Sequence, residues 1–183
     1  MEGSGEWGSG RVERIRQATS GDLPRIIALD REIFGVYGAD ESPAVIQTRL
    51  EVFPAGCVVL EEATEAGTKT GEDVRLLGYL TTEKWAAVRE PVLDEDPRLT
   101  HVPTGAILNI TTLAIAPQQQ QRGLGAQLIE YAVALAKQEN CTTIVLETAR
   151  AERFYLRHGF VKHGERRQRD ILLHIMQMDL RKT

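Results

Sequence analysis

The sequence is poor in cysteine, has no long apolar segment and carries no excess of basic charge. Its two cysteines, Cys57 and Cys141, lie within or beside apolar segments, so neither a disulfide framework nor a metal site is predicted. No apolar segment approaches the roughly 20 residues that span a bilayer, and the first residues lack the apolar core of a signal peptide. The formal net charge is −4, whereas neutralising the phosphates of a nucleic acid requires a basic surface. We therefore expect no membrane insertion and no nucleic-acid partner.

What is present fits an ordinary globular protein. The chain has 183 residues, of which 42% are hydrophobic and 26% charged, so one domain with its own core is expected. Residues 1–11 contain four glycines and two serines, a composition typical of flexible coil. The sequence predicts a flexible tail over 1–11 and one cytoplasmic domain over 12–183.

Apolar periodicity predicts an α/β fold with a mixed sheet, in the order β-α-α-β-β-β-α-β-α-β-β. The expected strands are 14–18, 57–60, 74–81, 106–116, 142–146, 161–167 and 171–178, and the expected helices are one from Leu23, 42–50, one after Arg122 and 151–157. Two segments between them are expected to be loops. Residues 61–73 are polar and favour a solvated hairpin loop, and residues 83–105 are long and proline-rich, as substrate-binding loops often are.

The segment most informative about chemistry follows the apolar strand 106–116. Its residues Gln121, Arg122, Gly123, Leu124, Gly125 and Ala126 open an amphipathic helix. Glycines let a ligand approach the backbone, and a helix N-terminus offers unpaired N–H groups that suit a diphosphate. The alternative is a glycine-rich turn needed only for tight helix packing.

The glycines, followed at the end of a later strand by the acidic Glu147, also partly match a dinucleotide-binding unit. Leu128 occupies the third glycine position of that fingerprint, and too little chain follows to complete such a sheet.

Two motifs resemble the GNAT acetyltransferase superfamily. One is Gln120-x-x-Gly123-x-Gly125 after a strand, and the other is a strand ending at Glu147 followed by Phe154-Tyr155-Leu156-Arg157-His158-Gly159-Phe160. The resemblance implies a GNAT-like fold, acetyl-CoA as cosubstrate and no metal. It also implies that the main chain of Leu113, Ala114 and Ile115 pairs with the pantetheine arm, and that residues 121–126 cradle the pyrophosphate. An open strand edge suits this, because pantetheine carries two amides.

A further resemblance concerns the arylalkylamine N-acetyltransferase subgroup. The stretch His101-Val102-Pro103-Thr104-Gly105 is similar to one that precedes the central strand in those enzymes. The proton-relaying histidines of that subgroup are replaced here by Asn109 and Thr111, which puts the arylalkylamine substrate in doubt.

For catalysis, the resemblance implies Tyr155 as the general acid that protonates the leaving thiolate. A backbone N–H of the central strand near Ile115 would stabilise the oxyanion. Glu147 is the first candidate for the general base, although it would equally suit an ion pair with an arginine. His101, His174 or a water chain held by Asn109, Thr111 and Glu147 stay open as alternatives.

The sequence thus predicts acetyl transfer from acetyl-CoA to a primary amine of a small molecule. A protein N-terminus or lysine is an alternative acceptor, and a non-catalytic acyl-CoA sensor is an alternative function. A homodimer stays open. Trp85 is expected to line the acceptor pocket or to anchor its loop, and residues 165–169 are expected to form a solvated hairpin.

Overall fold

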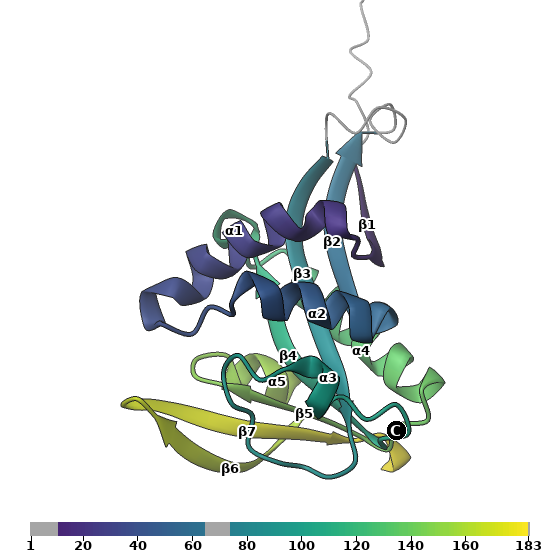
Figure 1. Ribbon diagram of the computed structural model, residues 1–183, viewed down its shortest axis with the longest axis vertical. Coiled ribbons are helices and arrows are strands. Elements are labelled where there is room, and N and C mark those ends of the chain that lie inside the picture. Colours follow the sequence, from purple (N-terminus) through teal and green to yellow (C-terminus); the bar gives the residue numbers. More distant parts are fainter. Residues whose placement is uncertain (1–10, 65–73, 183) are drawn as a thin grey trace, which may run out of the picture.

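A mixed sheet of seven strands forms the centre of the computed structural model, which describes residues 11–64 and 74–182 (Figure 1). The strand order is β1-β2-β3-β4-β5-β7-β6, and every neighbouring pair is antiparallel except β4 and β5. The strands are β1 (Arg11–Gln17), β2 (Cys57–Thr64), β3 (Val74–Trp85), β4 (Ile107–Ile115), β5 (Thr143–Thr148), β6 (Val161–Gln168) and β7 (Ile171–Asp179). The predicted α/β class with a mixed sheet is confirmed, and the order of elements differs only by a short helix, α3 (Pro97–Thr100), between β3 and β4.

Helices cover both faces of this sheet (Figure 1). On one face, α1 (Leu23–Phe34) and α2 (Pro43–Val52) pack over β2–β4, in a cluster that includes Ile26, Ile46 and Tyr79. On the other face, α4 (Leu124–Gln138) and α5 (Glu152–Arg157) pack over a larger cluster. No helix in the described ranges is long and apolar enough to cross a membrane.

Local signals explain where the helices begin. The Ser42 hydroxyl accepts a hydrogen bond from the Val45 N–H, and Pro43 follows in the first turn, where a missing N–H costs nothing. The apolar stripe predicted for α4 is buried along its length, at Leu124, Leu128, Ile129, Ala132, Leu135 and Ala136.

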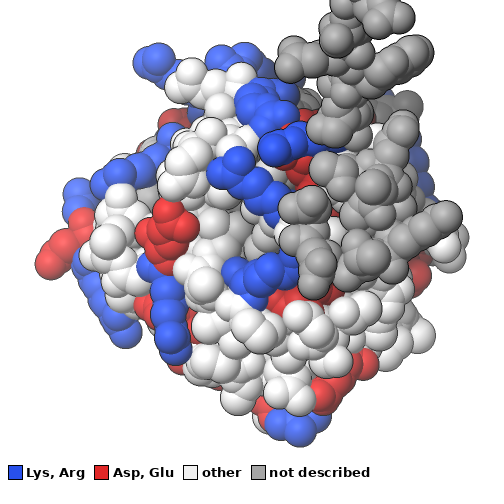
Figure 2. Space-filling model, turned by 90° about the horizontal axis from the view of Figure 1, so that it is seen from above, with Lys and Arg blue, Asp and Glu red and all other residues white. Residues whose placement is uncertain are grey.

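The predicted loop at 61–73 is wrong at its first residues, because β2 continues to Thr64. Glu61 is fully buried there, and its carboxylate binds Arg14 and Arg16 of β1. These cross-strand ion pairs let charged residues continue a strand. Viewed from above, blue Lys and Arg side chains are accompanied by red Asp and Glu side chains (Figure 2). The rest of that loop and the tail over 1–10 lie outside the described residues, and β1 already begins at Arg11.

The long segment 83–105 is anchored rather than loose. Its first residues belong to β3, and Pro97–Thr100 form the single turn α3. Glu83 is buried and accepts hydrogen bonds from Arg49 of α2 at 3.0 Å, from the Thr100 hydroxyl at 2.9 Å and from the Trp85 indole. A buried carboxylate requires such partners, so this cluster fixes the segment against α2.

Candidate active site

The sheet opens between β4 and β5. These strands form only three residue pairs, Ile107↔Thr143, Leu108↔Ile144 and Asn109↔Val145, although both continue beyond them. On its other side, β4 stays paired with β3 up to Ile115. A gap therefore begins just after Asn109 and Val145.

The backbone of β4 presents hydrogen-bonding groups to this gap. The Ala116 N–H donates to the Leu77 carbonyl of β3 at 2.8 Å, and successive residues of a strand point to opposite sides. Leu113 and Ile115 therefore direct their N–H and C=O groups into the gap, while Ala114 faces β3. The Gln120 side-chain amide donates to the Ile115 carbonyl at 3.4 Å, which agrees with this direction.

A β-bulge lies at the start of the gap. Thr81 pairs with Thr112 and Thr82 with Ile110, so Thr111 has no residue opposite it. Before the bulge, Leu108 and Ile110 face the α4 side, and after it Leu113 and Ile115 do. Asn109, Thr112 and Ala114 consequently share the opposite face, towards α1 and α2. Bulges redirect side chains in this way and are frequent beside active sites.

The turn into α4 forms a cradle of backbone N–H groups. Gly123 caps the helix with φ of 78°, a left-handed conformation, and offers no side chain to the first N–H groups. A Cβ at Gly123 would meet nothing within 4 Å, so space is open above these groups. A Cβ at Gly125 would lie 3.0 Å from the Phe154 ring, so close packing explains this second glycine. The cradle fits a diphosphate, since its orphan N–H groups need an acceptor.

The Arg122 side chain is bound to groups outside the cradle. Its guanidinium hydrogen-bonds to Gln119 and donates to Glu13 of β1 at 2.5 Å, with Glu62 of β2 3.8 Å away. This arginine is thus held by the carboxylates of the neighbouring strands.

Tyr155 lies on the α4 side of the sheet, within the larger core cluster. Its ring meets Phe154 and Phe160 edge to face, with centroids 5.1 and 5.4 Å away. Burial raises the pKa of Tyr155 well above its usual value, so the side chain stays protonated at neutral pH. Within the described ranges, no residue hydrogen-bonds to its hydroxyl, which leaves that proton available.

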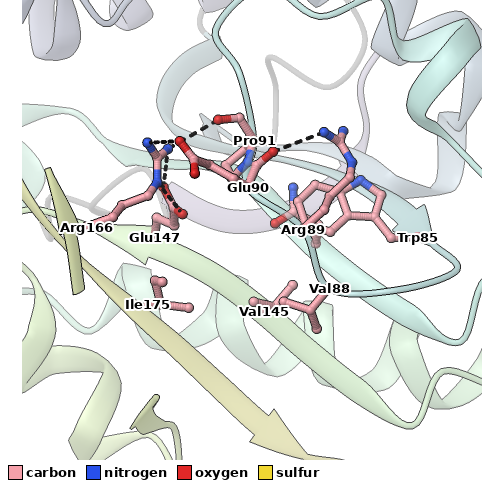
Figure 3. Close-up of a pocket in the computed structure, with 10 residues that line it drawn as sticks. Trp85, Val88, Arg89, Glu90, Pro91, Val145, Glu147, Arg166 and Ile175 are labelled. Carbon is pink, nitrogen blue, oxygen red and sulfur yellow. Dashed lines mark hydrogen bonds and ion pairs between the residues drawn. The ribbon is translucent and has the colours of Figure 1, made fainter. Parts of the chain in front are cut away.

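A pocket of about 300 Å³ lies on the opposite face of the sheet, where β4 and β5 part (Figure 3). Its walls come from β3, β4, β5, β6, β7 and the segment after Trp85. The lining residues are Trp85, Val88, Arg89, Glu90, Pro91, Asn109, Val145, Glu147, Arg166 and Ile175. Because Asn109 and Val145 are the last residues paired across β4 and β5, the pocket meets the gap.

Glu147 lines this pocket and is held by Arg166 (Figure 3). Arg166 donates from Nε to Oε1 of Glu147 at 2.8 Å and from Nη2 to Oε2 at 2.7 Å. It also binds the Glu90 carboxylate at 2.9 Å and the Pro91 carbonyl at 3.2 Å. An ion pair with an arginine, the other role expected for Glu147, is thus present in the structure. Arg166 joins β5 and β6 to the segment after Trp85.

Neither histidine considered as a base lines the pocket. His101 Nδ1 accepts a hydrogen bond from the Lys84 N–H at 3.1 Å, its ring packs on Phe53, and burial lowers its pKa. His174 lies on the other face of β7 from Ile175, 3.3 Å from Glu165.

The comparison with protein families decides which fold family this arrangement represents. A model of the acetyltransferase (GNAT) domain matches residues 55–162. The chain belongs to the GNAT family. Its general chemistry is therefore acyl-CoA-dependent N-acyl transfer, as the two motifs predicted. A comparison with curated proteins finds no match.

Solved structures of GNAT proteins share the fold. The loading GNATL domain of CurA from Lyngbya majuscula is 17% identical, with a TM-score of 0.77 over 94% of this chain and 100% of that one. The GphF GNAT-like decarboxylase in complex with isobutyryl-CoA is 20% identical, with a TM-score of 0.71 over 91% of this chain and 99% of that one. N-acetylglutamate synthase from Neisseria gonorrhoeae, complexed with coenzyme A and N-acetyl-glutamate, is 19% identical, with a TM-score of 0.66 over 92% of this chain and 35% of that one.

Within this GNAT domain, sequence reasoning missed Arg166. Residues 165–169 were expected to form a solvated hairpin, yet Arg166 faces the pocket and its side chain is only 15% exposed. In the structure every second residue of β6 is half-buried, and Arg166 is one of them, but the sequence of this strand carries no apolar alternation that would have indicated it. Trp85 does line the pocket, and it also anchors the long segment through Glu83.

Proposed function

We propose that this protein transfers an acetyl group from acetyl-CoA to a primary amine of a small molecule. The observation that carries the proposal is that a pocket meets the gap between β4 and β5, at the pair Asn109 and Val145. A donor thioester lying in the gap and an amine lying in the pocket would approach each other at this point. Holding both reactants in this way is itself a large part of catalysis.

Contacts between the connection of α1 to α2 and the β6–β7 hairpin support a small acceptor. Arg169, at the tip of the β6–β7 hairpin, donates to the Gly38 carbonyl at 2.9 Å, between α1 and α2. Arg150, after β5, stacks on Tyr37 with its guanidinium carbon 4.7 Å from the ring centroid. These contacts join the β6–β7 hairpin and the segment after β5 to the connection between α1 and α2. They favour a small amine over a protein N-terminus or a lysine side chain.

The proposed roles follow from where each group lies. Leu113 and Ile115 would pair with the pantetheine amides. The backbone from Gln121 to Ala126 would cradle the diphosphate through its N–H groups up to Gly125, because the Ala126 N–H already donates to the Gly123 carbonyl at 3.1 Å. Bound in this way, acetyl-CoA supplies an activated thioester. A β4 N–H directed into the gap would stabilise the oxyanion, which requires no reorganisation. Tyr155 would protonate the departing sulfur, and Glu147, fixed by Arg166, would orient the amine.

The experiment is a screen of primary amines for release of free CoA thiol from acetyl-CoA. Replacing Tyr155 with Phe should lower kcat by roughly 100-fold or more, because general acid catalysis contributes about 10²–10⁴-fold. The dissociation constant for CoA should change little. Tyr131→Phe is the matched control, since the Tyr131 hydroxyl donates to the Ala55 carbonyl at 2.8 Å, away from the pocket.

Two outcomes would contradict the proposal. CoA binding without any amine-dependent thiol release would support an acyl-CoA sensor instead. The screen also includes a dicarboxylic acyl-CoA, because one structural neighbour is described as a GNAT-like decarboxylase. Release of carbon dioxide without amide formation would show that the protein decarboxylates an acyl-CoA and does not transfer an acetyl group.

A further inference from the structure

Each of the two arginines that line the pocket is already bound by two carboxylates. Their partners are Glu147 and Glu90 for Arg166, at 2.7 and 2.9 Å, and Glu95 and Glu83 for Arg89, at 2.8 and 3.5 Å. Among the described residues, no other Lys or Arg lines the pocket. An acidic group on the acceptor would therefore meet no unpaired cation there.

The same groups leave an excess of negative charge beside the pocket. Their two guanidinium groups and four carboxylates carry a formal charge of −2. Glu83 also binds Arg49 at 3.0 Å, but that arginine is balanced by Glu41, 2.6 Å from it. Arg150 and Arg169 are held at the connection between α1 and α2 and line no part of the pocket. A cleft with an excess of one charge attracts ligands of the opposite sign, so a cationic acceptor is favoured.

Glu90 is the carboxylate best placed to receive a cation. Its side chain is 67% exposed, and the described residues provide one partner for it, the Arg166 guanidinium. Glu147 is only 13% exposed and accepts three hydrogen bonds from Arg166. Since a carboxylate has about four lone-pair sites, Glu90 keeps room for an ammonium group. It lies on the segment after Trp85, across the pocket from Val145 (Figure 3).

Much of the remaining lining is apolar. Val88, Val145 and Ile175 lie along the side opposite Glu90, and Trp85 closes one end (Figure 3). Methylene groups can pack against such a surface, and removing them from water is favourable. The pocket therefore suits a molecule that combines a hydrocarbon body with a cationic end.

We propose that the acceptor is a diamine, acetylated on the nitrogen that lies at Asn109 and Val145 and held through its second, positively charged nitrogen by Glu90. This inference rests on the proposed acetyl transfer and names its substrate class. A negative charge that binds the reacting ammonium group would also hinder the loss of its proton, whereas the second nitrogen keeps its charge throughout. Glu90 can therefore supply binding that does not oppose the reaction.

The transfer itself balances as for any primary amine. The neutral nitrogen attacks the acetyl carbon, and a C–N bond forms as the C–S bond breaks. One proton leaves the nitrogen for water, while Tyr155 gives a proton to the sulfur and later regains one from water. The products are free CoA and a monoacetylated diamine that keeps one positive charge.

The test compares acceptors that differ only at the end remote from the reacting amine. Each alkane diamine from diaminopropane to diaminohexane is assayed beside the alkylamine in which a methyl group replaces the second nitrogen and the amino acid in which a carboxylate does. For wild type, kcat/KM should be about 10-fold higher for the best diamine than for its alkylamine, and lowest for its amino acid. High salt should narrow this preference, because ions screen an exposed charge pair.

Glu90→Gln removes the charge of this side chain and keeps its shape. It should lower the ratio of kcat/KM for the diamine to kcat/KM for the alkylamine by about 10-fold, mainly through KM for the diamine. Glu130→Gln is the matched control, since Glu130 is an exposed glutamate of α4 on the other face of the sheet. This control should keep the wild-type ratio.

The outcomes separate the two proposals. If the wild-type chain releases no thiol with any amine, the proposed function and the diamine inference both fall. If alkylamines or amino acids are acetylated as efficiently as diamines, acetyl transfer stands and the diamine inference falls. If wild type prefers diamines and Glu90→Gln keeps the full preference, Glu90 does not bind the second nitrogen and the inference is overturned at that residue.

Discussion

Replacing Gly123 with alanine should separate the conformational role of this residue from its role in binding. Its φ of 78° is left-handed, and an L-residue with a Cβ there costs about 1–2 kcal/mol. For a domain of this size, 1 kcal/mol shifts Tm by roughly 2–4 °C, so a fall of about 2–8 °C is expected. No clash adds to this, because the new Cβ would meet nothing within 4 Å.

The open space beside Gly123, which keeps the loss of stability small, is also where a diphosphate would lie. An added Cβ would occupy part of this space. If it costs the ligand one hydrogen bond to a charged group, the loss is about 2 kcal/mol, or roughly 30-fold in the dissociation constant. Calorimetric titration with CoA measures this loss, and thermal unfolding without ligand measures the strain.

Gly38→Ala is the matched control. Gly38 is also left-handed, with φ of 60°, and an added Cβ would approach only the Arg169 guanidinium, at 3.2 Å. It should lower Tm by a similar amount and leave CoA affinity unchanged. If Gly123→Ala loses stability yet binds CoA as tightly as the Gly38 variant, the cradle is not the diphosphate site.

Two further predictions concern buried charges. Arg49→Met removes the buried arginine that joins the Glu83 and Glu41 carboxylates and leaves Glu83 with Arg89, 3.5 Å away, which should lower the free energy of unfolding in urea by about 3 kcal/mol. A loss below about 1 kcal/mol would show that the carboxylates find water or other partners. The hydrogen bond from Arg16, with further bonds from Thr19, holds the pKa of Asp22 well below its ordinary value, so its contribution to stability is present above about pH 4 and is lost as pH falls through the lower folded-state pKa. Asp22→Asn should therefore be less stable than wild type at pH 7, with a gap that narrows below pH 4 in acid titrations followed by circular dichroism.

Much of the fold could be predicted because its signals are local. The apolar segment ending at Pro117, the stripe along α4 and the cap at Ser42 each lie within a few consecutive residues. The two GNAT motifs are likewise short segments, and they were sufficient to predict the family.

The pocket could not be predicted in the same way, because its contacts join distant parts of the chain. Arg166 is 76 residues from Glu90 and 19 from Glu147, and nothing near any of the three reveals the others. The bulge at Thr111 also has no sequence signal, since a threonine fits a regular strand equally well. That one extra residue nevertheless decides which β4 side chains face the pocket.

Because β4 and β5 share only three residue pairs, the sheet consists of two parts, β1 to β4 and β5 to β7, joined along a short seam. A peptide-like ligand in the gap would behave as a temporary strand, extending the seam with hydrogen bonds to Leu113 and Ile115. The donor would then be part of the architecture while it is bound. Rigidity would rise when it enters and fall when CoA leaves, so the protein would alternate between a stiffer and a looser form with each turnover.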